Sequence, residues 1–354
     1  MNGEPVTVVV VNHQGERHLP STLPAIAALE GPVAERILVD SGSEDASLRI
    51  VRERFPQFRV IALGSNRGPA AARNRALAEA KTRLLLTFDN DVVPEADCLR
   101  RLLEAWRSGV VAAAPRAILD ADRSRIHYDG AWFHYAGLFA LRHFYAPLDP
   151  AAAGGAVEVD GAIALALLLD REAALAAGGF EEGYFILFED QDLCYRLRAS
   201  GGTILSVPGA RVLHRAGTEG FSLRPGTGYA ERRTFLHARN RWLFLMRNYR
   251  PRTAFAALPG LLLYEALSFG FALRNGHAAA YLRGKAEALR ARAAARAARE
   301  ALERRRVLPD RSLLRGRPLT ITPSLRKGWL RGLLFRAVEE ALAAWWGIGR
   351  RLAG

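Results

Sequence analysis

The sequence predicts an α/β protein with a mainly parallel central sheet flanked by helices. Short runs with the character of buried strands alternate four times with helical segments, and the connections are short. This alternation is typical of a parallel sheet covered on both faces. Charge divides the chain: residues 231–354 hold 26 Lys and Arg against 8 Asp and Glu, a net +18, whereas residues 1–230 carry −4. We therefore expect an α/β domain at 1–230 and a basic, helical C-terminal region at 231–354.

Runs rich in Val, Ile and Leu locate the strands, and amphipathic or Ala-rich runs locate the helices. The strands are expected at residues 6–11, 36–40, 60–63, 84–88, 110–114, 160–169, 203–207 and 210–214. The helices of this part are expected at 19–29, 46–55, up to 80, 95–106, 171–177 and near 193–198. Residues 116–157 are rich in aromatic and His side chains, which fits either the lining of a sugar site or surface hairpins with a small core.

Polar residues follow the first four predicted strands. They are Asn12, Asp40, Asn66, Asp89 and Asp91. In parallel sheets, ligands bind outside the carboxyl ends of the strands, so these side chains are expected to share one binding edge. The alternative is ordinary loop polarity, although four strand ends in a row exceed what loop composition requires.

Two acids two residues apart, Asp89 and Asp91, end the fourth strand. Carboxylates suit a hard divalent cation such as Mg²⁺ or Mn²⁺, which in turn binds a diphosphate. A turn held by a side-chain cap explains the same pattern. His214, at the end of a later strand, is a candidate nitrogen ligand, and a structural histidine is the alternative.

A short acidic window lies among apolar residues at 185–198. It holds Glu189, Asp190 and Asp192 at the start of a predicted helix, where the helix dipole favours acids. Capping alone is one interpretation. The other is catalytic: Asp190 acts as a general base, Glu189 orients the acceptor or tunes the pKa of its neighbour, and Asp192 caps the helix or pairs with Arg196.

The order of these motifs resembles the family 2 glycosyltransferases, which have a nucleotide-diphospho-sugar (GT-A) fold. The resemblance is to the rhamnosyltransferase-like branch of bacterial surface-polysaccharide enzymes. The matching stretches are VVVVNHQGERHL, ILVDSGSED, NRGPAAARNRAL, LLLTFDNDV, DGAIALALLLDREAALAAGGFEE, FEDQDLCYRL and VPGARVLHRAG. Two departures are Pro69, where an aromatic or small apolar residue is more usual, and Asn90 at the centre of the metal motif.

The resemblance implies roles for individual residues. Asp190, with Glu189 beside it, matches the base that deprotonates the acceptor hydroxyl. Asp91 matches the metal-binding aspartate, Asp89 assists it or contacts the ribose, and His214 joins the metal shell in some members. The implied nucleotide-sugar-binding residues are Asn12, Asp40, Ser41, Asn66, Gly68, Asp89 and Asn90.

The resemblance also implies an inverting, metal-dependent transferase of cell-surface polysaccharide synthesis. The donor would be a UDP- or dTDP-linked sugar, the acceptor a hydroxyl of a glycan or lipid-linked glycan, and the cofactor Mg²⁺ or Mn²⁺. A sugar-nucleotidyltransferase is disfavoured because residues 12–17 hold a single Gly and no triphosphate loop. The remaining alternative is a non-catalytic nucleotide-sugar or lipid-binding scaffold.

The basic region predicts contact with an anionic membrane surface. Residues 253–273 are about long enough to span a bilayer, but Glu265 and Pro259 make a simple transmembrane helix doubtful. Residues 328–352 are typical of an amphipathic interfacial helix. A helical bundle or an oligomer interface is the alternative, and nucleic acid is not an expected partner. Two cysteines in apolar contexts indicate a reducing compartment, so we expect a cytoplasmic protein, peripheral to the inner face of the membrane.

Overall fold

A computed structural model describes residues 3–149, 154–215, 229–320 and 329–353. The chain divides into two compact units. Unit 1 comprises Met1–Ala131, Arg142–Leu197 and Gly202–Ala216, and unit 2 comprises Trp132–Leu141, Arg198–Gly201 and Gly217–Gly354. The domain boundary predicted at residue 230 stays a prediction.

Unit 1 is built on one mixed sheet with the strand order β10-β12-β6-β11-β4-β1-β2-β3. Two short strands join this path, β5 beside β12 and β7 beside β6. The strand bounds are β1 Val6–Asn12, β2 Val33–Asp40, β3 Phe58–Ala62, β4 Leu84–Asp89, β5 Val92–Pro94, β6 Val110–Leu119, β7 Ile126–Tyr128, β10 Val157–Val159, β11 Ala166–Asp170 and β12 Thr203–His214.

The predicted α/β class with a mainly parallel sheet is confirmed. Strand β1 pairs in parallel with β2 and β4, β2 with β3, and β6 with β12. All seven residues of β1 are buried, as expected for a central strand covered on both faces. Strand β11 is antiparallel to both β4 and β6, which makes the sheet mixed.

Three strand predictions differ from the structure. The strand expected at 110–114 continues through Pro115 to Leu119 as β6, where it pairs with β12 and β7. The apolar run expected as one strand at 160–169 forms regular strand only from Ala166, where pairing with β4 begins. The strands expected at 203–207 and 210–214 form one continuous strand, β12, because a register shift between Val207 and Arg211 absorbs the Pro-Gly interruption. Pairing with neighbours thus overrides the local signal at all three places.

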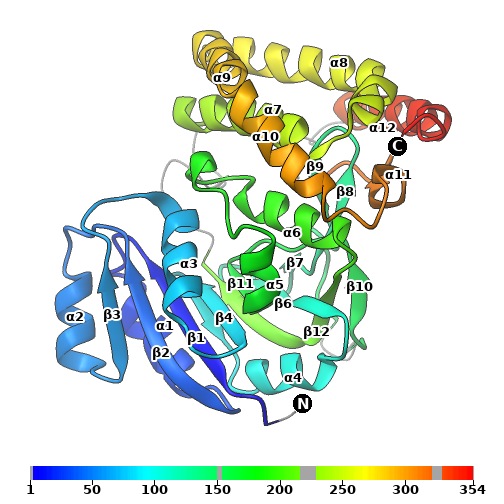
Figure 1. Ribbon diagram of the computed structural model, residues 1–354. Coiled ribbons are helices and arrows are strands. Elements are labelled where there is room, and N and C mark those ends of the chain that lie inside the picture. The colour runs from blue at the N-terminus through cyan, green and yellow to red at the C-terminus, as the bar shows by residue number, and fades with distance from the viewer. Residues whose placement is uncertain (1–2, 150–153, 216–228, 321–328, 354) are drawn as a thin grey trace. The chain divides into compact units, whose positions relative to one another are not determined.

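The helices of unit 1 agree with the predicted segments to within a few residues. Figure 1 shows α3 and α5 on the near face of the sheet and α1 on the far face. The bounds are α1 Leu19–Ala27, α2 Ser47–Arg54, α3 Gly68–Glu79, α4 Cys98–Ala105, α5 Arg171–Ala176, the 3₁₀ helix η1 Glu182–Tyr184 and α6 Glu189–Ala199.

Unit 2 is mainly helical, with a small sheet of order β13-β8-β9. Residues from the aromatic-rich segment contribute two of its strands. The bounds are β8 Ala131–His134, β9 Leu138–Leu141, β13 Leu314–Arg315, α7 Glu231–Asn248, α8 Pro251–Arg274, α9 Ala278–Arg290, α10 Arg292–Glu303, α11 Asp310–Leu313 and α12 Trp329–Gly349.

Glu265 is the polar centre of this helical unit. Its carboxylate accepts hydrogen bonds from Trp242 Nε1 at 2.6 Å and Lys285 Nζ at 2.9 Å, and also from Arg241 and Tyr281. Burial opposes the charged form, but Arg241 and Lys285 outweigh it and lower the pKa of Glu265 to about 2. The acid that interrupts the apolar run therefore ties α8 to α7 and α9.

Replacing Glu265 by Ala should destabilise unit 2 strongly. The change leaves Arg241 and Lys285 without their shared carboxylate, and breaking such a pair costs about 3 kcal/mol or more. Equilibrium urea unfolding of the full chain measures the loss. The control is Glu300→Ala, which removes a surface pair with Arg296 and should leave stability close to wild type. Equal stabilities for the two variants would contradict this role of Glu265.

Candidate active site

The carboxyl ends of β1 and β2 hold a buried polar cluster. Parallel pairing places Asn12 directly opposite Asp40. Asn12 Nδ2 donates to Asp40 Oδ1 at 2.8 Å, and Ser43 donates to the same carboxylate through Oγ at 2.6 Å and through its backbone N–H at 2.9 Å. These donors hold the Asp40 carboxylate in one orientation at the sheet edge.

A cavity of about 490 Å³ opens beside Asp40, within the size range of small-molecule sites. It is lined by His13, Gln14, Asp40, Gly42, Ser43, Glu44, Leu48, Ala62, Gly64, Ser65 and Asn66. Asn66 Nδ2 lies 2.9 Å from His13 Nε2 across this space. Two predicted nucleotide-binding residues, Asp40 and Asn66, therefore line the same cavity.

Asn12, Ser41 and Asn90 stand behind the cavity lining. The Ser41 hydroxyl accepts a hydrogen bond from Arg67 N at 3.1 Å, which ties the end of β2 to the loop before α3. Asn90 Nδ2 donates to Asn12 Oδ1 at 2.9 Å, which ties the end of β4 to the end of β1. These three predicted residues do not line the cavity, but their hydrogen bonds support the chain segments that do.

Gly68 lets a strained segment pass close to the start of α3. Its φ is +78°, and a Cβ there would lie 2.3 Å from the carbonyl oxygen of Phe185. The passing segment contains three non-Gly residues with positive φ: Phe185 at 65°, Leu187 at 71° and Phe188 at 78°. Such backbone strain costs free energy and clusters at functional sites. It precedes Glu189 and Asp190 directly.

Arg73 joins two of the acidic motifs. Its guanidinium donates to Asp89 Oδ1 at 2.6 Å and to Glu189 Oε1 at 3.2 Å, and its side chain is 3% exposed. It also donates to the carbonyl oxygen of Ala164 at 3.1 Å. One buried cation therefore connects the end of β4 to the start of α6.

Arg73 had no predicted role. It belongs to the buried face of the Ala-rich helix α3, which also includes Ala70, Ala72 and Ala76. A single Arg on such a face was the available signal, because a buried guanidinium requires acidic partners.

Burial sets Glu189 and Asp190 apart. Desolvation, reinforced by the charge of Asp190, raises the pKa of Glu189 to about 8, so Glu189 holds a proton at pH 7. Desolvation also raises the pKa of Asp190, while Arg73 and two backbone N–H donors oppose the rise. These donors belong to Gln191 at 2.7 Å and Ala164 at 3.3 Å. Asp190 is thus the better placed of the two acids to work as a charged base.

Asp91 and His214 meet at the exits of β4 and β12. Strand β5 pairs with β12, and this pairing brings His214 opposite Val92. Asp91 Oδ2 lies 3.4 Å from His214 Nε2. Two ligands of one octahedral cation lie about 3 Å apart, so this oxygen–nitrogen pair fits a shared Mg²⁺ or Mn²⁺.

Among the residues that the structure describes, no group of three or more His, Cys, Asp or Glu side chains is arranged to hold a metal. The donor chemistry of Asp91 and His214 still fits a cation whose other ligands come from a diphosphate and from water, as is usual for Mg²⁺. Asp89 accepts a hydrogen bond from Arg73. Burial raises the pKa of Asp89, Arg73 opposes this rise, and the charge of Asp91 adds to it.

His127, which had no predicted role, contacts His214 directly. The two Nδ1 atoms are 2.8 Å apart, and the rings stack with centroids 4.9 Å apart. Burial is the main cause that lowers the pKa of His127 to about 3, so this ring is neutral. The contact occupies Nδ1 of His214 and leaves its Nε2 facing Asp91.

Tyr128 follows His127 in the aromatic-rich segment. Its hydroxyl is buried and, among the described residues, has no hydrogen-bond partner. Burial and the charges of Asp190 and Asp89 raise its pKa. Nothing in the sequence separated His127 and Tyr128 from the other aromatic residues at 116–157.

Asp192 has the structural role that one prediction gave it. Its carboxylate accepts hydrogen bonds from Arg196 Nε at 2.8 Å and from the Tyr184 hydroxyl at 3.1 Å. The predicted pair with Arg196 is confirmed.

Part of the chain matches a family model, and the chain is similar to two bacterial proteins of known name. The family model described as Glycosyl transferase family 2 matches residues 7–156. The succinoglycan biosynthesis protein ExoO of Rhizobium meliloti (strain 1021) is 35% identical over 100 residues, which is 28% of this chain and 29% of ExoO. The N-acetylglucosaminyl-diphospho-decaprenol L-rhamnosyltransferase of Mycobacterium tuberculosis (strain ATCC 25618 / H37Rv) is 29% identical over 235 residues, which is 58% of this chain and 75% of the relative.

The fold matches solved structures as well. The mannosyltransferase PcManGT from Pyrobaculum calidifontis, solved with GDP-Man and Mn²⁺, superposes with a TM-score of 0.51 at 19% identity. The superposition covers 96% of this chain and 86% of PcManGT. This likeness confirms the predicted GT-A fold.

Gly68→Ala should damage stability and activity together, because its Cβ would collide with the Phe185 carbonyl and displace the segment that precedes Asp190. Gly64→Ala is a matched control: its φ is +76° and its Cβ would meet nothing within 4 Å. We expect a loss of about 1 kcal/mol for the control from the positive φ, and about 2 kcal/mol more for Gly68→Ala. Urea unfolding measures the free energy of unfolding of the two variants. Equal losses would show that the close approach to Phe185 does not contribute to stability.

Proposed function

We propose that this chain, whose residues 7–156 match the family 2 glycosyltransferase model, transfers a sugar from a nucleotide-diphospho-sugar to a hydroxyl group of a glycan or lipid-linked acceptor. One observation carries the proposal. The same sheet edge holds a cavity beside Asp40, an oxygen–nitrogen pair at Asp91 and His214 that fits a cation, and a half-buried acid at Asp190. Donor, diphosphate and acceptor each have a chemically suitable partner there.

The nucleotide is proposed to occupy the cavity lined by Asp40 and Asn66. An Asp40 carboxylate held by Asn12 and Ser43 can accept a hydrogen bond from the imide N–H of uracil or thymine. This chemistry supports a UDP- or dTDP-linked donor. The tight loop at Gly68 and the Ser41 hydroxyl keep the walls of this site in place.

A divalent cation, Mg²⁺ or Mn²⁺, is proposed to bind at Asp91 and His214, with Asp89 nearby. When bound, it supplies positive charge against the leaving diphosphate. The Nδ1 contact with His127 directs Nε2 of His214 toward that position. Arg73 holds Asp89 in place at the end of β4 and adds a fixed positive charge beside the acids.

The Asp190 carboxylate is proposed to accept the proton of the acceptor hydroxyl. The acceptor oxygen then forms a bond to the anomeric carbon as the bond from that carbon to the diphosphate oxygen breaks. A single displacement inverts the anomeric configuration and needs only one carboxylate at the reacting face. Glu189, protonated at pH 7, adds no second negative charge to repel the leaving group.

The acceptor is proposed to be lipid-linked, and the protein to work at the inner face of the cell membrane in cell-surface polysaccharide synthesis. The M. tuberculosis relative is named for an N-acetylglucosaminyl-diphospho-decaprenol acceptor, which supports this class. The basic, apolar-rich residues 231–354 support contact with anionic lipid rather than with nucleic acid.

Asp190→Asn should abolish transfer while leaving donor binding nearly unchanged. Loss of the base lowers kcat by 10²-fold or more, whereas the nucleotide cavity lies at Asp40 and Asn66. Radiolabelled sugar transfer and titration calorimetry with the nucleotide-sugar measure the two quantities. The control is Glu182→Gln, an exposed acid in the same region, which should keep wild-type kcat. Normal turnover by Asp190→Asn would refute the base assignment. If the unmutated protein itself bound the donor but transferred no sugar, the result would favour a scaffold.

The raised pKa of Asp190 predicts the acid limb of the pH profile. The rate kcat/KM should fall as pH drops through a value above the usual range of an aspartate, because only the charged carboxylate accepts the proton. Arg73→Met removes the cation that opposes this rise, so it should move the limb to still higher pH. If the acid limb lay at the same pH in both proteins, Asp190 would not be the group whose ionisation sets it.

The cation site is tested by metal affinity itself. Mn²⁺ binding in the presence of UDP, followed by electron paramagnetic resonance, should weaken by at least tenfold in Asp91→Asn and in His214→Ala. His127→Ala should weaken it by about tenfold, as loss of a supporting contact to a ligand does. Asp192→Asn is the control, since its carboxylate is bound to Arg196. Wild-type affinity in Asp91→Asn would rule out this site.

A further inference from the structure

The exposed face of α8 is apolar, the reverse of a helix in a soluble bundle. Its exposed residues recur every three or four positions and so form one stripe along the helix. They are Phe255, Leu258, Leu262, Ala266, Phe269 and Leu273. Phe255 is 73% exposed and Leu262 is 59% exposed. The stripe therefore forms a continuous exposed apolar surface, unlike the single apolar residues scattered over most protein surfaces.

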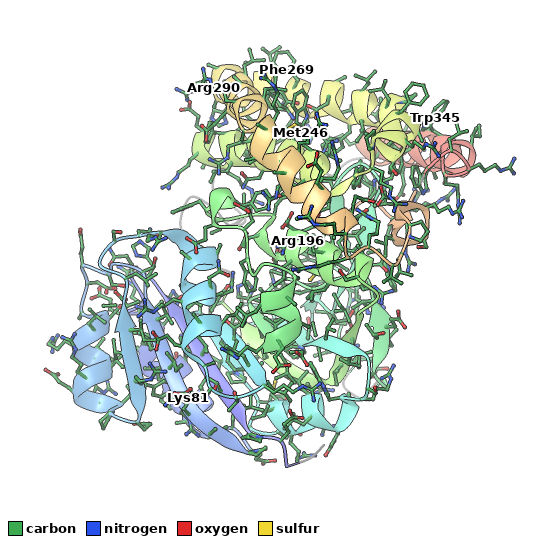
Figure 2. The ribbon with its side chains drawn as sticks, in the orientation of Figure 1. Lys81, Arg196, Met246, Phe269, Arg290 and Trp345 are labelled. Atoms are coloured by element: carbon green, nitrogen blue, oxygen red, sulfur yellow. The ribbon has the colours of Figure 1, made fainter. Side chains whose placement is uncertain are left out.

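Helix α12 repeats the pattern. Its exposed stripe, continued just past the helix end, is Leu334, Ala337, Ala341, Trp345, Ile348 and Leu352. The two helices pack together: Trp345 Nε1 donates to the carbonyl oxygen of Ala256 at 2.8 Å. Figure 2 shows Phe269 on α8 and Trp345 on α12. The two stripes therefore belong to one helix pair, which we call the α8–α12 pair.

The opposite face of α8 is fixed within unit 2. Glu265 is bound by donors from α7 and α9, as described above. Gly260 packs so closely on Tyr135 that a Cβ would lie 1.9 Å from the Tyr135 hydroxyl oxygen. The Tyr135 ring in turn stacks on Trp346 of α12, with centroids 4.7 Å apart. Removing α8 from this bundle would expose the charged groups around Glu265.

Basic residues border the apolar stripes. Exposed Arg252 and Arg274 stand near the two ends of α8, and exposed Arg350 and Arg351 follow α12. Residues 231–354 as a whole carry a net charge of +18. Apolar side chains flanked by Arg match a bilayer interface, where acyl chains receive the former and anionic headgroups the latter.

We propose that the α8–α12 pair is a docking surface for an anionic lipid bilayer, with α8 lying in the plane of the interface rather than crossing it. Helix α8 is the one described helix that is long and apolar enough to span a membrane, but that test rests on length and composition alone. The proposal deepens the proposed function, because it says how the chain reaches a lipid-linked acceptor. Its tests use binding and labelling, which do not depend on catalysis.

Vesicle flotation tests the surface. The full-length protein should float with vesicles of phosphatidylcholine and phosphatidylglycerol, and at least tenfold less with phosphatidylcholine alone. Leu262→Glu and the double variant Phe255→Glu/Leu262→Glu should lose flotation by at least tenfold. Val307→Glu is the matched control, because Val307 is 69% exposed and lies outside the pair. Hydrolysis of a nucleotide-sugar without vesicles should stay at the wild-type rate in all three variants.

Failure of this proposal is distinguishable from failure of the proposed function. Equal flotation of Leu262→Glu and wild type would overturn the docking surface even if donor hydrolysis is intact. A second result would also overturn it: the wild-type protein is a dimer by light scattering and does not float, and Leu262→Glu is a monomer. The stripe would then bind a second copy of the chain. Flotation without any donor hydrolysis would leave the docking surface standing and count against the transferase.

Cysteine labelling tests the orientation of α8. Cys98 and Cys194 are buried, so single exposed cysteines at either end of the helix can be labelled selectively. Arg252→Cys and Asn275→Cys, each bound to sealed vesicles, should both react with a membrane-impermeant maleimide at the rate seen without vesicles. A helix of 24 residues extends about 36 Å, enough to cross the bilayer. Protection of one end by tenfold or more would therefore show a spanning helix and overturn the in-plane arrangement.

Discussion

The contacts of Arg73 are the interactions on which the candidate active site depends. A fully buried guanidinium is costly unless it has partners, and Arg73 forms an ion pair with Asp89 at the end of β4 and donates a hydrogen bond to Glu189 at the start of α6. The pairing connects two chain segments 100 residues apart and holds positive charge beside Asp190. The cation side and the base side of the proposed reaction are therefore fixed relative to one another by one residue.

Strain and burial near Arg73 serve the same end. The segment from Phe185 to Phe188 takes three positive φ angles and passes over Gly68, which places the start of α6 against α3. Burial makes ionisation of both Glu189 and Asp190 unfavourable. Glu189 responds by holding a proton, whereas backbone N–H donors stabilise the charged form of Asp190. Backbone strain and desolvation thus place one carboxylate, that of Asp190, where it can act as a base.

The sequence predicted the α/β class, the strands β1 to β4 and the start of β6, and the polar residues at the strand ends, because these depend on local apolar runs. It missed the break in the run at 160–169 and the fusion of two runs into β12, which depend on pairing with neighbouring strands. Arg73 and His127 went unassigned because their roles come from contacts with Glu189 and His214, distant in the sequence. In the sequence, Glu265 is only an interruption of an apolar run, because its four hydrogen-bond donors come from other helices.

A crystal structure with an intact, slowly transferred donor analogue and Mn²⁺ tests the arrangement of the site most directly. We expect the base beside Asp40 and Asn66, the cation on Asp91 and His214, and the anomeric carbon open to attack from the side of the Asp190 carboxylate. A diphosphate bound away from Asp91, or a sugar whose anomeric carbon faces away from Asp190, would contradict the proposed reaction.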